Sequence, residues 1–164
     1  MLTMTGRALV YGDNINTDLI IAGKYTKTLD FKDLASHCLE DLDPQFIHKV
    51  RKGDVLVAGE NFGCGSSREQ APLALKHAGV SAVLAKSFAR IFYRNAINLG
   101  MPAVLCDTSD ILEGDRLSID LQNGTVTVNE GRIIHCQRLS GVMRGILDHG
   151  GLVNYINHKG DLIL

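Results

Sequence analysis

The chain has 164 residues, of which 45% are hydrophobic, and these values suit one soluble domain covering residues 1–164. Its formal net charge of -1 gives no general attraction to nucleic acid or to anionic membranes, and the absence of tryptophan disfavours a base-stacking surface. The N-terminus lacks the apolar segment of a signal peptide, and no run approaches the length of a membrane span. We therefore expect a cytoplasmic protein that binds neither nucleic acid nor a membrane.

The four cysteines are widely separated in the sequence, at Cys38, Cys64, Cys106 and Cys136. Without a C-x-x-C pair they form neither a zinc knuckle nor a self-contained iron–sulfur motif, and in a reducing cytoplasm we expect free thiols. The six histidines are scattered without ligand-like spacing, so we expect no metal to be bound by this chain itself. Cys64 lies in a Gly/Ser loop, where a small residue more often fills space than acts as a nucleophile.

The first predicted strand is Gly6–Val10, and a turn-rich segment with several Asx residues follows it. Residues 22–28 are polar and lack periodicity, so we expect an exposed loop there. A helix is predicted over Asp30–Leu39 with Asp30 as its N-cap. The mixed-charge residues 45–52 show no clear pattern.

The middle of the chain alternates buried strands with helices. Apolar runs and helical spacing predict a strand at Val55–Ala58, a helix ending at Gly79, a strand at Val80–Ala85, a helix from Ser87 to Gly100 and a strand at Met101–Leu105. This alternation predicts a parallel α/β unit, in which the loops at the carboxyl ends of the strands form the ligand-binding edge.

The helix predicted from Ser87 to Gly100 has the clearest pattern in the chain. Ser87 is placed to cap its start, and Gly100 is placed to end it in the left-handed conformation. Arg90 and Arg94 lie four residues apart on one face, which we expect to be solvated. Residues at helical spacing predict a side that faces the core: Phe88, Ile91, Phe92, Asn95 and Leu99.

The last third of the chain changes character. Short strands are predicted at Asp115–Asp120, Thr125–Val128 and Arg132–Cys136. Asn123-Gly124 is a hairpin signal between the first two strands, and helices are predicted from Ser140 to about Asp148 and near Leu152–Asn157. The whole pattern indicates an α/β fold with a mixed sheet, in which short β-strands are added to a parallel α/β core.

The most informative stretch is the loop at Gly59–Gln70, which leaves a buried strand and enters a helix. Its glycines permit positive φ and let a ligand approach the backbone closely. Ser67 and Gln70 have the spacing of a capping box. Two hydroxyls and a guanidinium beside the unpaired N–H groups of a helix start predict an anion site.

Two other interpretations of this loop stay open on its residues alone. A Gly/Ser segment before a helix is often only a turn and a cap. A phosphate-binding loop is the second, although no Lys-Ser or Lys-Thr follows the glycines, and Arg68 stands where a dinucleotide fingerprint has its third glycine.

Three segments taken together resemble the small subunits of 3-isopropylmalate isomerase and homoaconitase, which are hydro-lyases of the aconitase superfamily. The segments are Gly12–Asp18, Gly59–Glu69 and Lys86–Ala96, and the similarity covers essentially the whole chain. Gln70 departs from the family pattern, which most often has histidine there, whereas the serines and the arginine of the loop are intact.

The resemblance implies a swivelling β/β/α domain like domain 4 of aconitase. It also implies a larger partner subunit that carries a [4Fe-4S] cluster, in a heterodimer or heterotetramer, and a chain that is inactive alone. The lack of a cluster motif in this sequence is expected on that basis.

The family reaction moves a hydroxyl between adjacent carbons of a hydroxy-dicarboxylic acid by dehydration and rehydration. By residue match, the resemblance implies that Ser66 is the base that removes a proton α to a carboxylate. Positive potential from the helix start and from Arg68 would favour its alkoxide form. Ser67 and Arg68 are implied as carboxylate binders, and Asp18 matches an acidic position near the family's active site.

In relatives, the loop aligned with Tyr25–Thr28 covers the variable group of the substrate. Thr26 and Lys27 are therefore candidate substrate-binding residues, because an aliphatic side chain there suits an isopropyl group and a cation suits an additional carboxylate. Isopropylmalate is the first expectation, since it is the commonest role of a separate small subunit, and a homoaconitase or methylated-malate dehydratase is the alternative. A non-catalytic anion-binding module also stays open.

Overall fold

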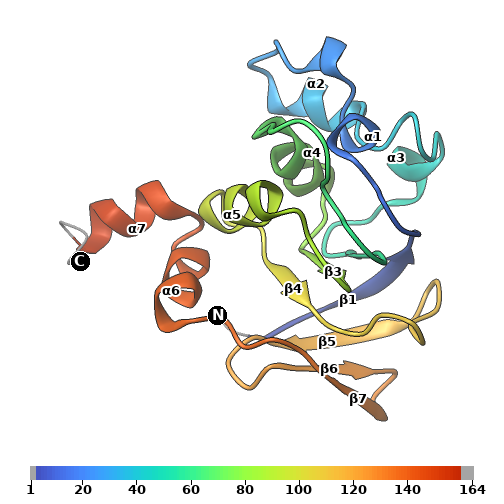
Figure 1. Ribbon diagram of the computed structural model, residues 1–164, viewed down its shortest axis with the longest axis vertical. Helices are drawn as coiled ribbons and strands as arrows, with labels where there is room; N and C mark the ends of the chain where they lie inside the picture. Colours follow the sequence, from blue (N-terminus) through green and yellow to red (C-terminus); the bar gives the residue numbers. More distant parts are fainter. Residues whose placement is uncertain (1–2, 160–164) are drawn as a thin grey trace.

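A mixed seven-stranded sheet organises the part of the chain that the computed structural model describes, residues 3–159 (Figure 1). The strands lie in the order β4-β3-β2-β1-β5-β6-β7. Strands β1 to β4 pair in parallel and the remaining pairs are antiparallel. The parallel pairing of β2 to β4 confirms the α/β unit expected at Val55–Leu105. Their bounds are β1 Thr3–Val10, β2 Val55–Val57, β3 Ala82–Ala85, β4 Ala103–Leu105, β5 Arg116–Asp120, β6 Thr125–Val128 and β7 Arg132–His135.

Strand β1 belongs to both halves of the sheet. Its first part, Thr3–Arg7, pairs with β5, and its last part, Ala8–Val10, pairs with β2. Just beyond the two outer strands, Cys106 and Cys136 form an isolated antiparallel bridge. The sheet is therefore curled into a half-barrel whose outer strands approach each other.

Helices cover the outer face of the parallel strands, and α6 and α7 extend from the end of the half-barrel (Figure 1). None of the helices in residues 3–159 is long and apolar enough to cross a membrane. Their bounds are α1 Thr17–Ile20, a 3-10 turn at Gly23–Tyr25, α2 Phe31–Ser36, α3 Phe46–Lys49, α4 Gln70–Ala78, α5 Arg90–Asn98, α6 Gly141–Asp148 and α7 Leu152–Lys159.

Side chains of the parallel strands alternate between two apolar clusters. Leu9 and Leu56 pack against the helices, whereas Ala8, Val55 and Val57 pack against β5 and β6 inside the curl. Both faces of β2 are therefore buried, which explains why its sequence is a continuous apolar run instead of an alternating one.

Several local signals in the sequence are confirmed. The Asp30 side chain accepts a hydrogen bond from the Lys32 N–H at 2.9 Å and caps α2. Gly79 and Gly100 follow α4 and α5 with φ values of 112° and 83°, the left-handed conformation that glycine adopts most easily. The hairpin expected between β5 and β6 is also present.

The expected start of α5 is wrong. The helix begins at Arg90 with Ala89 at the N-cap, and no side chain caps it. The residues before it are held in an extended path because Phe88 forms a parallel bridge with Phe62. Ile91 is 51% exposed and not in the core, because the first turn of α5 borders a surface cavity.

Two single-turn helices are absent from the sequence-based prediction. Helix α1 is capped by Asn16, whose side chain accepts from the Leu19 N–H at 2.8 Å. Helix α3 contributes the fully buried Phe46. The loop expected to be exposed at residues 22–28 contains a 3-10 turn, and the Tyr25 ring in it stacks on His37 with centroids 3.6 Å apart.

Phe62 offers a direct test of how the loop after β2 is anchored. Its ring is fully buried and packs edge-on against Phe88 and Phe92, with centroids 6.0 and 5.1 Å away. We expect Phe62→Ala to lower the free energy of unfolding by about 3–5 kcal/mol, because it leaves a cavity in this cluster. Urea denaturation measures the loss, and Ile91→Ala on the exposed side of α5 is the control. A loss below about 1 kcal/mol for Phe62→Ala would contradict the packing role.

Candidate functional site

The candidate site lies at the carboxyl edge of the parallel strands, where the loops after β1, β2 and β3 meet. Backbone hydrogen bonds join these loops. The Asn14 N–H donates to the Glu60 carbonyl at 2.8 Å, and the Gly63 N–H donates to the Ile15 carbonyl at 2.8 Å. The three segments that carry the family resemblance are therefore one structural unit, although they are far apart in the sequence.

The inner half of the loop after β2, residues 59–63, is fixed to its neighbours. The Asp13 carboxylate accepts from the Glu60 N–H at 2.7 Å, and the Ser87 hydroxyl accepts from the Asn61 N–H at 2.7 Å. Ser87 also donates to the Glu60 carboxylate at 2.8 Å. Ser87 therefore joins the loop after β3 to the loop after β2, and it does not cap α5.

Gly63 is required where the loop crosses α5. Its φ is 81°, and a Cβ atom at this position would overlap the Phe92 ring. The backbone therefore passes directly over a core aromatic ring before it turns outward, and only glycine combines this conformation with this contact.

The outer half of the loop, residues 64–69, is different. No hydrogen bond within residues 3–159 uses the backbone N–H groups from Cys64 to Glu69. The side chains of Ser66 and Ser67 are exposed and line a cavity of about 500 Å³ together with Arg68. Consecutive unpaired N–H donors, two hydroxyls and a guanidinium around one cavity are the components of an anion site.

The predicted capping box is wrong. Helix α4 begins at Gln70 with Glu69 at its N-cap, and no side chain caps it. The Ser67 hydroxyl therefore makes no hydrogen bond within residues 3–159, and the Gln70 side chain donates instead to the Thr26 carbonyl at 3.3 Å. The capping-box pattern places the N-cap at Ser67, whereas it lies two residues later, at Glu69, and this leaves Ser67 outside the first turn of the helix.

Arg68 is held by groups from the segment around α1. Its guanidinium forms an ion pair with Asp18 at 2.6 Å and donates to the Ile21 carbonyl at 3.3 Å. The guanidinium also lies against Gly23, where a Cβ atom would come within 3.2 Å of it. The structure thus brings Asp18 to Arg68, with the Arg68 side chain 23% exposed toward the cavity.

The candidate specificity residues lie beside the same helix start. The Thr26 hydroxyl donates to the Gly23 carbonyl at 2.8 Å, so it stabilises its own turn. The bond from Gln70 to the Thr26 carbonyl fixes this turn to the start of α4, next to Arg68. Lys27 is exposed, and it forms no ion pair within the described part of the chain.

Three further residues, which the sequence analysis did not assign to the site, border it. Arg90 and Arg94 of α5 line the same cavity as Ser66. Thr17 is buried, and its hydroxyl donates to the Ser66 carbonyl at 2.9 Å, which fixes the backbone of that serine. The i, i+4 spacing of the two arginines shows that they share one face of a helix. Only the three-dimensional structure shows that this face lies beside the loop.

The donor groups in the described part of the chain do not fit an iron–sulfur cluster. Among residues 3–159 no three His, Cys, Asp or Glu side chains lie together in a metal-binding arrangement. Cys38 is fully buried among apolar groups, and burial raises the pKa of its thiol. Burial likewise raises the pKa of Cys106 to about 12. Cys64 is half-buried in the loop, and its carbonyl accepts from the Thr17 N–H at 2.8 Å.

Comparison with known proteins identifies the class to which this fold and site belong. Residues 13–107 match the Aconitase C-terminal domain family, a range that includes the loops around the candidate site. The chain therefore belongs to this family, and its curled sheet is the swivelling domain expected from the sequence.

Individual relatives are similar over almost their full length. The chain is 52% identical over 159 residues to a 3-isopropylmalate dehydratase small subunit from Caldanaerobacter subterraneus subsp. tengcongensis, covering 95% of this chain and 99% of the relative. It is 50% identical to a methanogen homoaconitase small subunit from Methanocaldococcus jannaschii, covering 96% and 94%. A crystal structure of a 3-isopropylmalate dehydratase from the same organism superimposes with a TM-score of 0.92 at 50% identity, covering 96% and 95%.

The pair formed by Asp18 and Arg68 can be tested on the free chain. We expect Asp18→Asn to tighten the binding of malonate, a simple dicarboxylate, by about three- to tenfold, because the substitution removes a negative charge next to the guanidinium. Isothermal titration calorimetry measures this affinity. The control is Asp41→Asn, which changes the same charge at an exposed position in the segment between α2 and α3. An affinity that is unchanged or weaker in Asp18→Asn would contradict the arrangement.

Proposed function

We propose that this chain is the small subunit of a two-subunit hydro-lyase that isomerises 2-isopropylmalate to 3-isopropylmalate by dehydration and rehydration. The observation that carries the proposal is the outer half of the loop after β2. There Ser66, Ser67 and Arg68 surround a cavity together with unpaired backbone N–H groups. The family membership and the relatives named for this activity support the same reaction.

Ser66 is proposed as the base that removes the proton α to a carboxylate. A serine hydroxyl is weakly acidic, so this role requires positive potential around its oxygen. The start of α4, the unpaired N–H groups and the guanidinium of Arg68 supply such potential. The bond from Thr17 to the Ser66 carbonyl keeps the backbone of the serine in place during proton transfer.

Ser67 and Arg68 are proposed to bind the substrate carboxylates. The planar guanidinium can donate two parallel hydrogen bonds to one carboxylate, and the Ser67 hydroxyl adds a third donor. The Asp18 carboxylate would repel the substrate carboxylates if it were in direct contact with them. We therefore assign Asp18 to positioning Arg68 and not to contacting the substrate.

Dehydratases of the aconitase family use a [4Fe-4S] cluster, and small-subunit names imply a large-subunit partner. Because the donor groups in the described part of the chain do not fit a cluster, we propose that the large subunit holds it. The departure of the hydroxyl is then carried out by groups of that partner, which must approach the cavity at Ser66. The active protein on this proposal is a heteromer.

Lys27 favours a second candidate, a homoaconitase that acts on a tricarboxylate. Lys27 follows Thr26 in the turn that Gln70 fixes to the start of α4, and on this proposal its ammonium binds an additional carboxylate of the substrate. A relative named homoaconitase small subunit is nearly as similar to this chain as the isopropylmalate dehydratase relative.

The base is tested by turnover of the heteromer, followed by the absorbance of the enoate intermediate. We expect Ser66→Ala to lower kcat about a thousandfold or more, as the loss of an essential catalytic group does in other enzymes. The control is Ser109→Ala, an exposed serine that hydrogen-bonds to Asp107 in another loop. A Ser66→Ala heteromer that keeps kcat within about tenfold would refute the role of Ser66 as the base.

The substrate is tested by comparing isopropylmalate with homoaconitate in the same assay. If Lys27 binds a third carboxylate, Lys27→Leu lowers kcat/KM for homoaconitate by about 10- to 100-fold, the value of one charged hydrogen bond, and does not lower it for isopropylmalate. The control is Lys24→Leu, which removes a neighbouring exposed ammonium. Equal changes for both substrates would show that Lys27 does not discriminate between them.

A further inference from the structure

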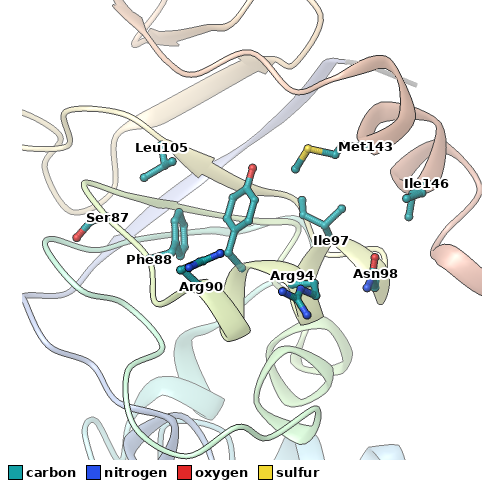
Figure 2. Close-up of a pocket in the computed structure, with 10 residues that line it drawn as sticks. Ser87, Phe88, Arg90, Arg94, Ile97, Asn98, Leu105, Met143 and Ile146 are labelled. Atoms are coloured by element: carbon teal, nitrogen blue, oxygen red, sulfur yellow. The ribbon is translucent and has the colours of Figure 1, made fainter. Parts of the chain in front are cut away.

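A second, apolar cavity lies directly beside the candidate site, between α5, α6 and the end of β4 (Figure 2). Its volume is about 590 Å³. Its walls are mainly apolar and come from α5 and the loop before it, from β4 and from α6: Phe88, Tyr93, Ile97, Leu105, Met143 and Ile146. Within residues 3–159, the Tyr93 hydroxyl makes no hydrogen bond, and burial raises its pKa.

Arg90 and Arg94 separate this cavity from the candidate site. Both line the two cavities at once, and in Figure 2 they lie along one edge of the apolar one. Both side chains are exposed, and neither forms an ion pair within the described residues, whereas Arg68 is paired with Asp18. The edge of the cavity nearest the site therefore carries two positive charges that are available to an acidic group.

These features favour a protein partner as the occupant. On the proposed function, a second subunit must bring the group that acts on the hydroxyl to the cavity at Ser66. If the surface of this second subunit covers the loop at residues 64–69, it also reaches α5, because Arg90 and Arg94 of α5 line the same cavity as Ser66. An apolar hollow with charged groups at its edge is typical of the centre and rim of a protein interface.

We propose that the apolar cavity and its two arginines form the docking surface for the large subunit, a proposal that rests on the proposed function. The complementary surface presents a bulky apolar side chain, which enters the cavity, and carboxylates beside it, which pair with Arg90 and Arg94. Because the arginines also border the candidate site, this contact sets how closely the partner approaches Ser66. The charge pairs at the edge accelerate association and fix its orientation.

The charges are tested by the affinity of the free chain for a purified large subunit of the isopropylmalate dehydratase type, measured without substrate by biolayer interferometry. We expect the double variant Arg90→Glu, Arg94→Glu to weaken the Kd at least about 30-fold, mainly through slower association, and to lose most of the salt dependence. The matched control is Arg51→Glu with Lys52→Glu, which reverses two exposed charges at the opposite, amino edge of the sheet.

The apolar part is tested by two neighbouring residues of α6. Met143 lines the cavity, whereas Val142 is 54% exposed and does not line it. We expect Met143→Glu to weaken the Kd about tenfold or more and Val142→Glu to change it less than about twofold. Thermal unfolding of each free variant confirms that it is folded, and Met143→Gln, which places no charge in the cavity, should have an intermediate effect.

The outcomes separate this proposal from the proposed function. If the wild-type chain forms no complex with the large subunit, the proposed function itself fails. If the complex forms and gives turnover, but the arginine and Met143 variants bind with unchanged Kd, the docking surface is wrong and the function stands. Equal losses in the variants and in their controls would also overturn the docking surface, because they would report a general effect of charge.

Discussion

The site depends on backbone hydrogen bonds that cross from one strand-end loop to the next. Each N–H group from Gly59 to Gly63 is bound, to a backbone carbonyl or to the side chain of Asp13 or Ser87. From Cys64 to Glu69 no hydrogen bond within the described residues uses an N–H group. The loop thus has an anchored half and a half with unpaired N–H donors, of which Gly65–Arg68 line the cavity. Because the first half is anchored, the N–H groups of the second half keep their positions before a ligand binds.

This division explains the placement of residues from separate segments of the sequence. Asp13 and Ser87 belong to different loops, yet both serve the segment Gly59–Gly63. Thr17 and Asp18 are consecutive in α1, and they hold the Ser66 carbonyl and the Arg68 guanidinium. The three resembling segments are therefore needed together, because two of them position the groups that the third presents.

The sequence was sufficient for the strands, the main helices and the loop. Apolar runs such as Val55–Ala58 identified buried parallel strands, and glycines such as Gly79 identified helix ends. Local capping signals were less reliable, because Ser67 and Ser87 lie near helix starts without capping them. Ser87 bonds to the loop after β2, and the N-cap of α4 is Glu69. Single-turn helices such as Phe46–Lys49 are too short for periodicity to reveal. The pairing of Asp18 with Arg68 depends on contacts between distant segments that no local pattern encodes.

The central claim is that this chain completes a hydro-lyase only together with a large, cluster-bearing subunit. The most direct measurement is the formation of the enoate from isopropylmalate, followed by absorbance, with each purified chain alone and with the two mixed under anaerobic conditions. The account predicts turnover that appears only in the mixture and saturates as the two chains reach equal amounts. A stable mixed complex with an intact cluster and no turnover of isopropylmalate or homoaconitate would contradict it, and would favour an anion-binding module.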